Sequence, residues 1–429
     1  MKKLNLIGIV CFVAALISCN QQESNSTSRE KNSGIDRNLN RDIKGSQDLA
    51  DAKSDGSNKV TVKENISDTD KLGKEKNNPS DDKENEQQQE FQNLDKYRNW
   101  MQLTFSEKQN KKLRDIIIPG THNSGTFRIS PTSNFANGSE KSHFIIDIIN
   151  SIPLLNGFVD GQIKDIFYNW SKTQNKSIRD QLKDGIRFLD LRVAPSKQSG
   201  SLMIVHGQES IELSQGLTEI ADFVKVNPKE IVFLKSSISY DYSVSASESD
   251  KSDAQENMLW MIGKYLNDYA YTQNMRDASI SDMWSSSKSI ILLHNDDLVN
   301  AWGQVKSNQH EKLLQNIDSF LATGLPDKFV EICLCLTPEG DDVIRYIAER
   351  YKVDGLVDFI GGAIDFFDGI FLTDVNEVAL NKFQSGLHSR LTSSLNQWQQ
   401  KKHRMNILSI DFYDEVNFVD RVIQMNKAR

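Results

Sequence analysis

The sequence predicts an α/β fold in the form of a distorted (β/α)₈ barrel, and three observations lead to it. Eight short apolar runs recur between residues 115 and 411, helical stretches separate most of them, and polar residues follow several of the runs. Continuous apolar runs are typical of parallel strands covered on both faces, and their alternation with helices favours a parallel sheet. Residues 96–429 are within the size range of such a barrel.

The expected strands are, in order, 115–119, 188–192, 202–206, 230–236, 289–294, 330–337, 368–373 and 406–411. The expected helices are 214–226, 257–271, 311–321, 341–351 and 377–398. The first of these helices begins at Ser214, a residue type that caps helices, and places Leu217, Ile220 and Val224 at helical spacing. The second and third strands are too close in sequence for a helix between them, so we expect an irregular barrel.

Residues 1–95 are expected to lie outside the barrel. Lys2 and Lys3 precede an apolar run over residues 4–17, which is typical of a secretory signal and too short to span a bilayer comfortably. Residues 20–90 contain no aromatic side chain, so they cannot bury enough apolar surface to fold and are predicted to be disordered. The predicted organisation is a signal peptide at 1–18, a polar tether at 19–95 and one barrel domain at 96–429.

The signal ends in Leu16-Ile17-Ser18-Cys19, which resembles the lipobox of bacterial lipoproteins. The resemblance implies that Cys19 becomes the lipidated first residue and anchors the protein in a membrane of the bacterial cell envelope or surface. An ordinary signal peptide and secretion are the alternative.

Composition excludes several other classes. The chain has 429 residues and a formal net charge of −8, which argues against nucleic-acid binding. Its 4 Cys cannot form a disulfide framework. Cys333 and Cys335 fall on one face of an expected strand, where we expect them to pack in the core without forming a disulfide. We expect a monomer.

Polar side chains capable of chemistry stand at the ends of five expected strands. They are His122 after the first strand, Arg192 at the end of the second, His206 at the end of the third, Lys235 near the end of the fourth and Asp411 at the end of the eighth. In a (β/α)₈ barrel, chemistry gathers at these ends. Two imidazoles can act as general base and general acid, and a guanidinium binds phosphate oxygens. The set therefore suits phosphodiester cleavage.

The same residues lie in segments that resemble the X domain of phosphatidylinositol-specific phospholipases C. The segments are, in order, 116–126 (IIIPGTHNSGT), 177–182 (SIRDQL), 185–192 (GIRFLDLR), 205–207 (VHG), 228–234 (PKEIVFL) and 406–412 (NILSIDF). The resemblance spans about residues 113–426 and is specific because separate motifs occur in the family order. It is nearest to the small, single-domain bacterial members.

The resemblance implies a role for each residue. His122 would be the general base, oriented by Asp411, and His206 the general acid. Arg192 would neutralise the phosphate, with Asp190 holding it in place. Lys235 and Asn123 would contact the substrate, a membrane phospholipid with an inositol headgroup. In such enzymes the inositol 2-hydroxyl attacks phosphorus, which releases diacylglycerol and a cyclic inositol phosphate.

The resemblance also bears on metals. Arg192 stands where calcium-dependent relatives have a metal-binding carboxylate, which implies an enzyme without a required metal. Asn123 stands where bacterial members usually have an Asp that assists the general acid. Because Asn also occurs there in the calcium-dependent group, a Ca²⁺ requirement stays open.

Two other functions stay open at this point. A barrel that binds lipid or phosphate with weak or lost turnover would be compatible with Asn123. A metal-dependent glycerophosphodiesterase would need carboxylates beside the first His, and Asn123-Ser124-Gly125 supplies none. Residues 144–170 form an insertion that is either a lid at the membrane interface or a cover for the barrel core. The Ser-rich residues 241–253 are expected to form a mobile loop.

Overall fold

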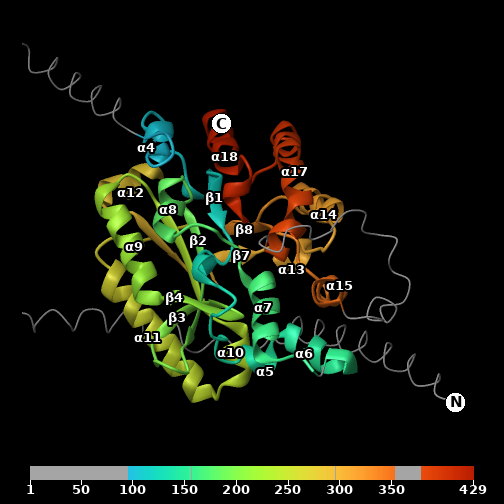
Figure 1. Cartoon of the computed structure of the whole chain (residues 1–429). Helices are drawn as coiled ribbons and strands as arrows, with labels where there is room; N and C mark the ends of the chain where they lie inside the picture. Colours follow the sequence, from blue (N-terminus) through green and yellow to red (C-terminus); the bar gives the residue numbers. More distant parts are fainter. Residues whose placement is uncertain (1–94, 156, 295, 353–377) are drawn as a thin grey trace, which may run out of the picture. The chain divides into compact units, whose positions relative to one another are not determined.

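The computed structural model describes residues 95–155, 157–294, 296–352 and 378–429, which form one sheet and the helices around it (Figure 1). The strands are β1 (Ile118–Thr121), β2 (Phe188–Pro195), β3 (Leu202–His206), β4 (Gln208–Glu212), β5 (Val232–Ile238), β6 (Ile290–Leu293), β7 (Leu298–Asn300), β8 (Phe329–Leu334) and β9 (Ile407–Ile410).

The longer helices are α6 (Phe144–Ser151), α7 (Asp160–Ser171), α9 (Leu213–Val226), α11 (Glu248–Leu266), α14 (His310–Ala322), α15 (Gly340–Tyr351), α17 (Ala379–Gln400) and α18 (Phe418–Lys427). Shorter helical segments are α4 (Trp100–Phe105), η1 (Leu113–Asp115), η2 (Thr126–Arg128), α5 (Ser139–Ser142), η3 (Pro153–Leu155), α8 (Ile178–Lys183), α10 (Tyr240–Ser245), α12 (Ile280–Ser286), α13 (Trp302–Val305) and η5 (Tyr413–Glu415). None of the helices in the described ranges has the length and apolarity needed to cross a membrane.

The barrel strands run parallel in the order β7-β8-β9-β1-β2-β5-β6. The central strand β1 pairs with two neighbours, so that Gly120 lies opposite Phe188 on one side and Ser409 on the other. A side chain at this position would collide with Phe188, because an added Cβ would lie 2.7 Å from that ring. The predicted α/β class and parallel strands are confirmed.

The sheet curls into an incomplete barrel. Strands β5 and β8 are separated by β2, β1 and β9, so they would be roughly 19 Å apart on a flat sheet. Lys235 on β5 nevertheless contacts Glu331 on β8, with Nζ and Oε2 2.8 Å apart. Within the described ranges, β6 pairs with β5 and β7 pairs with β8, but β6 and β7 do not pair with each other. The barrel is therefore distorted, as predicted, and open between these two strands.

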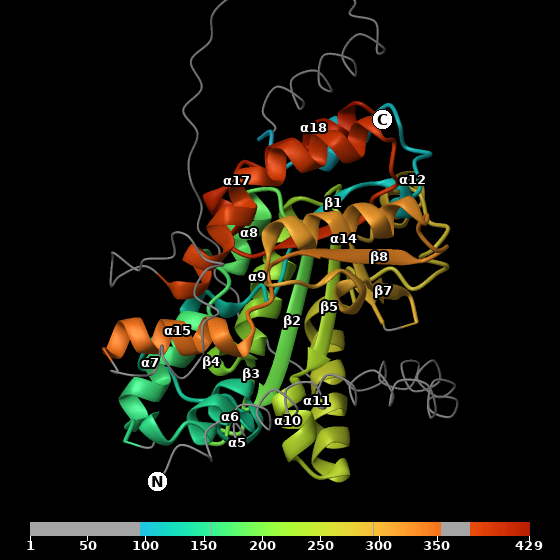
Figure 2. The same ribbon diagram turned by 90° about the vertical axis from the view of Figure 1, so that its right-hand side faces the viewer.

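The expected third strand is not part of the parallel barrel, which corrects the prediction. Strand β3 pairs antiparallel with the end of β2, with Val193 opposite Ile204, and then turns back into β4 (Figure 2). The physical reason is the short link over residues 196–201, because a parallel connection needs a dozen or more residues. Strands β4 and β7 were not predicted, and the strand expected at 368–373 lies outside the described residues.

The Ser-rich segment at 241–253 is helical, so the prediction of a mobile loop is wrong. Helix α10 covers its first part, and α11 begins at Glu248. The side chain of Ser247 accepts a hydrogen bond from the backbone N–H of Asp250 and so caps α11. Ser residues that we assigned to a loop thus include a helix cap. Helix α11 packs against α9, β2 and β5.

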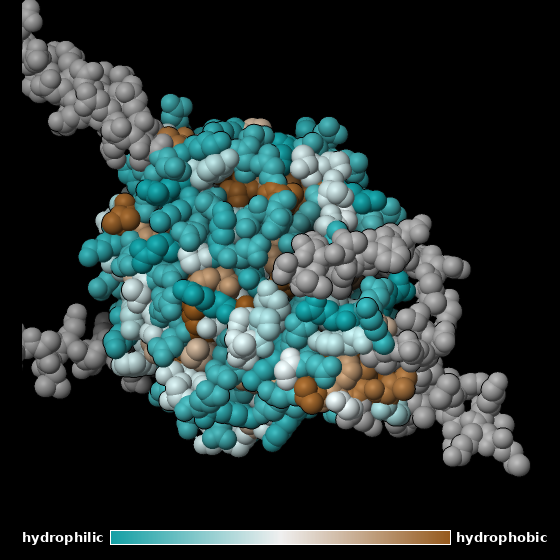
Figure 3. Space-filling model, in the orientation of Figure 1, coloured by the Kyte–Doolittle hydropathy of each residue, from teal (hydrophilic) through white to brown (hydrophobic). Residues whose placement is uncertain are grey.

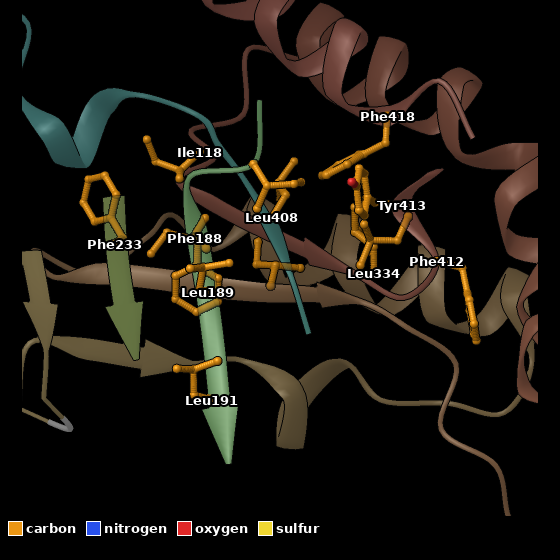
Figure 4. Close-up of a cluster of buried hydrophobic side chains, with 14 of the residues drawn as sticks. Ile118, Phe188, Leu189, Leu191, Phe233, Leu334, Leu408, Phe412, Tyr413 and Phe418 are labelled. Carbon is orange, nitrogen blue, oxygen red and sulfur yellow. The ribbon is translucent and has the colours of Figure 1, made fainter. Parts of the chain in front are cut away.

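The barrel interior changes from apolar to charged within one layer of side chains. The lower layer holds Phe188, Phe233 and Phe329, and the layer two residues further along the same strands holds Asp190, Lys235 and Glu331. The rings of Phe233 and Phe329 lie 5.6 Å apart, and Figure 4 shows Phe188 and Phe233 among the buried apolar side chains. The alternation of side chains along a strand explains the two-residue step. The charged layer faces the carboxyl ends of the strands, where the predicted site lies.

The insertion at 144–170 forms α6, η3 and α7. Helix α6 buries Ile145, Ile148 and Ile149, whereas Phe144 keeps 40% of its surface exposed. Leu154 and Val159 in the following turns are 53% and 64% exposed. Apolar residues gather on this part of the surface, near α6 (Figure 3). The segment therefore covers part of the core and also presents apolar side chains outward.

Candidate active site

The structure brings together the side chains that the sequence placed at strand ends. His122 follows β1 directly, Arg192 lies on β2, Lys235 on β5, and Asp411 follows β9. His206 is the last residue of β3, so it reaches the site from the antiparallel hairpin instead of from a barrel strand. The rings of His122 and His206 have centroids 6.2 Å apart and stand nearly edge to face.

A carboxylate holds His122. Its Nδ1 lies 2.9 Å from Oδ1 of Asp411, and Oδ2 of Asp411 accepts a hydrogen bond of 3.0 Å from Gln384 on α17. Burial alone would lower the pKa of His122, but the charge and hydrogen bond of Asp411 outweigh it, so the pKa lies above its ordinary value. Nδ1 thus carries a hydrogen, and Nε2 is the nitrogen that can take a proton from a substrate.

Asn123 adopts a left-handed backbone conformation, with φ of +44°, which Asn tolerates better than most residues. Its amide Nδ2 lies 3.1 Å from Nε2 of His122. The family resemblance placed this residue where an Asp would assist the general acid, but the contact that the structure shows is with His122, the predicted general base. Asn123 is almost completely buried, so a direct contact with substrate stays a prediction.

A backbone carbonyl, not a carboxylate, holds His206. Nδ1 donates to the carbonyl oxygen of Ser171 at the end of α7, at 2.7 Å. Burial lowers the pKa of His206 to about 3, and the neighbouring His122 contributes to this shift. Gly207 then turns the chain into β4 at a φ of +66°, and a side chain there would meet Oγ of Ser171 at 2.5 Å. The tight approach of α7 to this turn sets the direction in which His206 points.

Arg192 and Asp190 form a two-point ion pair on β2. Nε and Nη2 of Arg192 each lie 3.1 Å from an oxygen of Asp190, whose backbone N–H donates to Oγ of Ser124. Burial alone would raise the pKa of Asp190, but the charges of Arg192 and Lys235 hold it well below its usual value. The charge of Asp190 raises the pKa of Arg192, so both groups are ionised. Asp190 therefore holds the guanidinium in one orientation.

Lys235 lies in the charged layer, in register with Asp190 on the neighbouring strand. Its ammonium contacts Glu331 at 2.8 Å and Asp190 at 3.4 Å, and 13% of its side chain is exposed. Ser409 donates to the other oxygen of Glu331 at 3.0 Å. Lys235 thus joins two carboxylates of the charged layer, and its predicted contact with substrate stays a prediction.

Three contacts of the site were missed at the level of sequence. Glu331 carried a signal, because a single acidic residue interrupts the apolar run of β8. Gln384 carried none, since nothing in the sequence of α17 separates it from other polar residues of the helix. The carbonyl of Ser171 is backbone, and its part in the site depends only on how α7 packs.

Cys333 and Cys335 form a disulfide, which corrects the expectation of simple core packing. Residues two apart in an extended strand are about 6.6 Å apart, too far for the commonest disulfide geometry. Strand β8 ends at Leu334, however, and the bend beyond it brings the two Cα atoms to 5.2 Å. Both residues are buried, and their sulfurs lie near a ring nitrogen of His122, all within 4.8 Å of one another.

The residues of the site do not fit a Ca²⁺ ion, which prefers a cage of oxygen ligands. The carboxylates of Asp190 and Glu331 are bound to Arg192 and Lys235, and Asp411 is bound to His122. Within the described ranges, the group whose donor atoms lie close enough for a metal contains two sulfurs and one imidazole. The prediction of an enzyme without a required metal stays a prediction.

The arrangement places two imidazoles and a guanidinium in one site. Nε2 of His122 is positioned as a base, and the ring of His206 lies beside it with its centroid 6.2 Å away. Nε and Nη2 of Arg192 donate to Asp190. Among the described residues no partner binds Nη1, so this nitrogen can donate to a further anionic oxygen.

A known protein family matches part of the chain. The family described as phosphatidylinositol-specific phospholipase C, X domain, matches residues 151–295. Residues 151–295 are therefore similar to an X domain. The predicted resemblance is thereby confirmed for the part of the chain that holds Asp190, Arg192, His206 and Lys235. His122 and Asp411 lie outside the matched segment, and the structure brings them to it.

Several proteins named for an X domain are similar to parts of this chain. A PI-PLC X domain-containing protein of Dictyostelium discoideum is 34% identical over 129 residues, which are 30% of this chain and 20% of that protein. Human PI-PLC X domain-containing protein 2 is 33% identical over 137 residues, 32% of this chain and 41% of that protein. Mouse PI-PLC X domain-containing protein 3 is 24% identical over 346 residues, 77% of this chain and 94% of that protein. The first two alignments thus cover less than half of the relative.

Among solved structures, the phosphatidylinositol-specific phospholipase C of Listeria monocytogenes superposes with a TM-score of 0.48 at 16% identity, over 77% of this chain and 98% of that one. A variant of the Staphylococcus aureus phosphatidylinositol-specific phospholipase C gives a TM-score of 0.48 at 15% identity, with the same coverage.

Proposed function

We propose that the chain is a phosphodiesterase that cleaves a phosphatidylinositol-type glycerophospholipid without a required metal. The observation that carries the proposal is the pair of imidazoles 6.2 Å apart, with a guanidinium fixed by Asp190 beside them. The X-domain segment supports the substrate class. The net charge of −8 neither favours nor opposes this substrate class.

In the proposed reaction, Nε2 of His122 takes the proton of the inositol 2-hydroxyl while its oxygen bonds to phosphorus. The bond from phosphorus to the diacylglycerol oxygen breaks, and His206 gives that oxygen a proton. Arg192 neutralises the charge that grows on the phosphoryl oxygens. The products are diacylglycerol and a cyclic inositol phosphate, with the proton now on His122.

In the empty site, the pKa shifts favour the protonation state that the reaction produces, with the proton on His122 and none on His206. The raised pKa of His122 and the lowered pKa of His206 place a single proton on His122 in the empty site. The reaction must begin with that proton on His206. A bound phosphodiester supplies negative charge beside His206, and this would raise the pKa of that ring. Substrate binding is therefore part of what prepares the acid.

The exposed apolar residues near α6 support contact with a lipid surface. Phe144, Leu154 and Val159 project outward from the segment whose last helix, α7, supplies the Ser171 carbonyl. Partial insertion of such side chains into the interface would hold the site near its substrate.

We also propose that Cys19 is lipidated and that the protein is held at a membrane of the bacterial cell envelope or surface. The support is the sequence Leu16-Ile17-Ser18-Cys19, since residues 1–94 lie outside the described ranges. Full-length protein should incorporate radiolabelled fatty acid, and Cys19→Ser should abolish the label, whereas Cys11→Ser should keep it. Equal labelling of Cys19→Ser would refute the anchor.

The function is tested with the full-length chain on phosphatidylinositol vesicles, with phosphatidylcholine vesicles as the headgroup control. We expect release of water-soluble inositol phosphate that continues in EDTA and is lost in His122→Ala and His206→Ala. His310→Ala, which lies at the start of α14, serves as the matched control. Vesicle binding without release would support the lipid-binding alternative, and loss of release in EDTA would contradict the metal-free reaction.

A further inference from the structure

The disulfide beside the general base has no part in the proposed reaction. Cys335 follows Leu334 on β8, and His122 follows Thr121 on β1. Both preceding residues are in register with Ile410 on the strand between them. His122, Asp411 and Cys335 therefore stand at the same level of the barrel. Cys333 precedes Cys335 by two residues, so it lies on the same face of β8, in register with Ser409.

Once reduced, this group has the chemistry of a zinc site. Two thiolates and one imidazole are a common three-residue ligand set for Zn²⁺, with the fourth position left to water or substrate. The two sulfurs and a ring nitrogen of His122 already lie within 4.8 Å of one another, and a tetrahedral zinc site needs separations of about 3.5–3.8 Å. The residual movement is within the reach of side-chain rotation after the sulfurs separate.

The surroundings of His122 suit metal binding as well. Asp411 binds Nδ1, so the ring presents Nε2, and a carboxylate behind a metal-binding imidazole is a usual arrangement in zinc proteins. The amide of Asn123, 3.1 Å from Nε2, would have to turn away. Both sulfurs are almost completely buried, so a bound ion would be enclosed on the side of β8.

We propose that reduction of the Cys333–Cys335 disulfide creates a Zn²⁺ site formed by both sulfurs and Nε2 of His122, and that the bound ion stops turnover by occupying the base. A dithiol reductant would supply two electrons and two protons, giving two thiols and the oxidised reductant. Zn²⁺ then replaces both thiol protons, which are released to solvent. Metal binding stands independently, whereas the inhibition rests on the proposed phosphodiesterase function.

The test uses full-length chain carrying Cys11→Ser and Cys19→Ser, which leaves Cys333 and Cys335 as its cysteines. Thiol titration of the denatured protein should find no free thiol before reduction and two after treatment with a phosphine, which is then removed without air. Two free thiols before reduction would show that the disulfide is absent and would contradict the proposal that reduction creates the site.

Binding is measured with Co²⁺ as a spectroscopic probe and Zn²⁺ as its competitor. The reduced protein should take up one Co²⁺ per chain with a sulfur-to-cobalt charge-transfer band, and Zn²⁺ should erase that band. The oxidised protein should show none. Cys333→Ser and Cys335→Ser should each lose about half of the band, and His122→Ala should keep the band but bind more weakly. No band in the reduced protein, or an undiminished band in both serine variants, would overturn the site.

Inhibition is measured on phosphatidylinositol vesicles with stoichiometric Zn²⁺. The reduced protein should lose activity on the order of 10²-fold or more, because its base is occupied, while the oxidised protein should keep its activity. Cobalt binding in a protein that never releases inositol phosphate would contradict the proposed function and leave the metal site standing. Full activity of the zinc-loaded reduced protein would contradict the inhibition.

Discussion

His122 and His206 face each other across the site, but the two regions that hold them differ in kind. His122 ends a barrel strand and is backed by Asp411, itself held by Gln384 from α17. His206 ends an edge hairpin and is backed by the carbonyl of Ser171. A carboxylate stabilises an imidazolium far more than a carbonyl does, which explains why burial wins at His206 and loses at His122. The group bound to Nδ1 thus shifts the pKa of two similar rings in opposite directions.

The largest expected effect comes from removing either ring. His122→Ala and His206→Ala should each lower kcat by on the order of 10²- to 10⁴-fold, the usual contribution of a positioned acid or base. The double variant should be little worse than the single ones, because the two groups act in one step. Steady-state release of inositol phosphate checks this. Additive losses in the double variant would show that the rings do not work as a pair.

A smaller loss is expected when the guanidinium is replaced by another cation. Arg192→Lys should lower kcat by on the order of 10²-fold, because an ammonium cannot bind both Asp190 and a phosphate oxygen in one fixed plane. Arg179→Lys, which changes an exposed ion pair with Asp222, is the matched control and should be unaffected. An equal loss in the control would point to a general effect on folding.

The pH profile tests the difference between the two rings directly. The competent pair carries one proton, so kcat/KM should fall as pH rises through the pKa of His122, which lies above its usual value of about 6.5. Asp411→Asn removes the main group that raises this pKa and leaves burial, so the alkaline limb should move to lower pH. We expect a loss in rate of about 10- to 100-fold at neutral pH as well.

Asp222→Asn is the control for that variant, since Asp222 pairs with Arg179 on the surface. An alkaline limb that stays in place in Asp411→Asn would show that Asp411 does not set the proton affinity of His122. The comparison between the two regions would then fail.

The smallest effect is expected from the residue behind Asp411. Gln384→Leu should lower kcat/KM by about 2- to 10-fold, as expected for one neutral hydrogen bond to a positioned group. A merely structural role would lower the melting temperature and leave the pH profile unchanged, whereas a positioning role should also shift the alkaline limb. Measuring both quantities separates the two roles.

Sequence reasoning located most of the site because strand ends in a barrel converge, and the motifs around His122, Arg192 and Asp411 mark such ends. It assigned His206 to a barrel strand, although the residue belongs to an antiparallel hairpin. The apolar run at 202–206 has the same pattern in both cases, since a strand covered on both faces does not record the direction of its neighbour.

Contacts between elements far apart in the chain could not be derived from strand patterns or short motifs. Lys235 and Glu331 are 96 residues apart, and only the curl of the sheet brings them to 2.8 Å. The same holds for the approach of Cys333 and Cys335 to His122. The Cys333–Cys335 bond itself depends on where β8 ends, which the apolar run 330–337 did not reveal.

The sequence by itself determined the α/β class, the two imidazoles, the guanidinium and their family resemblance, because these follow from local periodicity and from residues in short motifs. The tertiary structure decided that β6 and β7 do not pair among the described residues, and it decided which group stands behind each ring. That second decision fixes the proton affinities, since electrostatic and hydrogen-bond energies depend on distances across the fold.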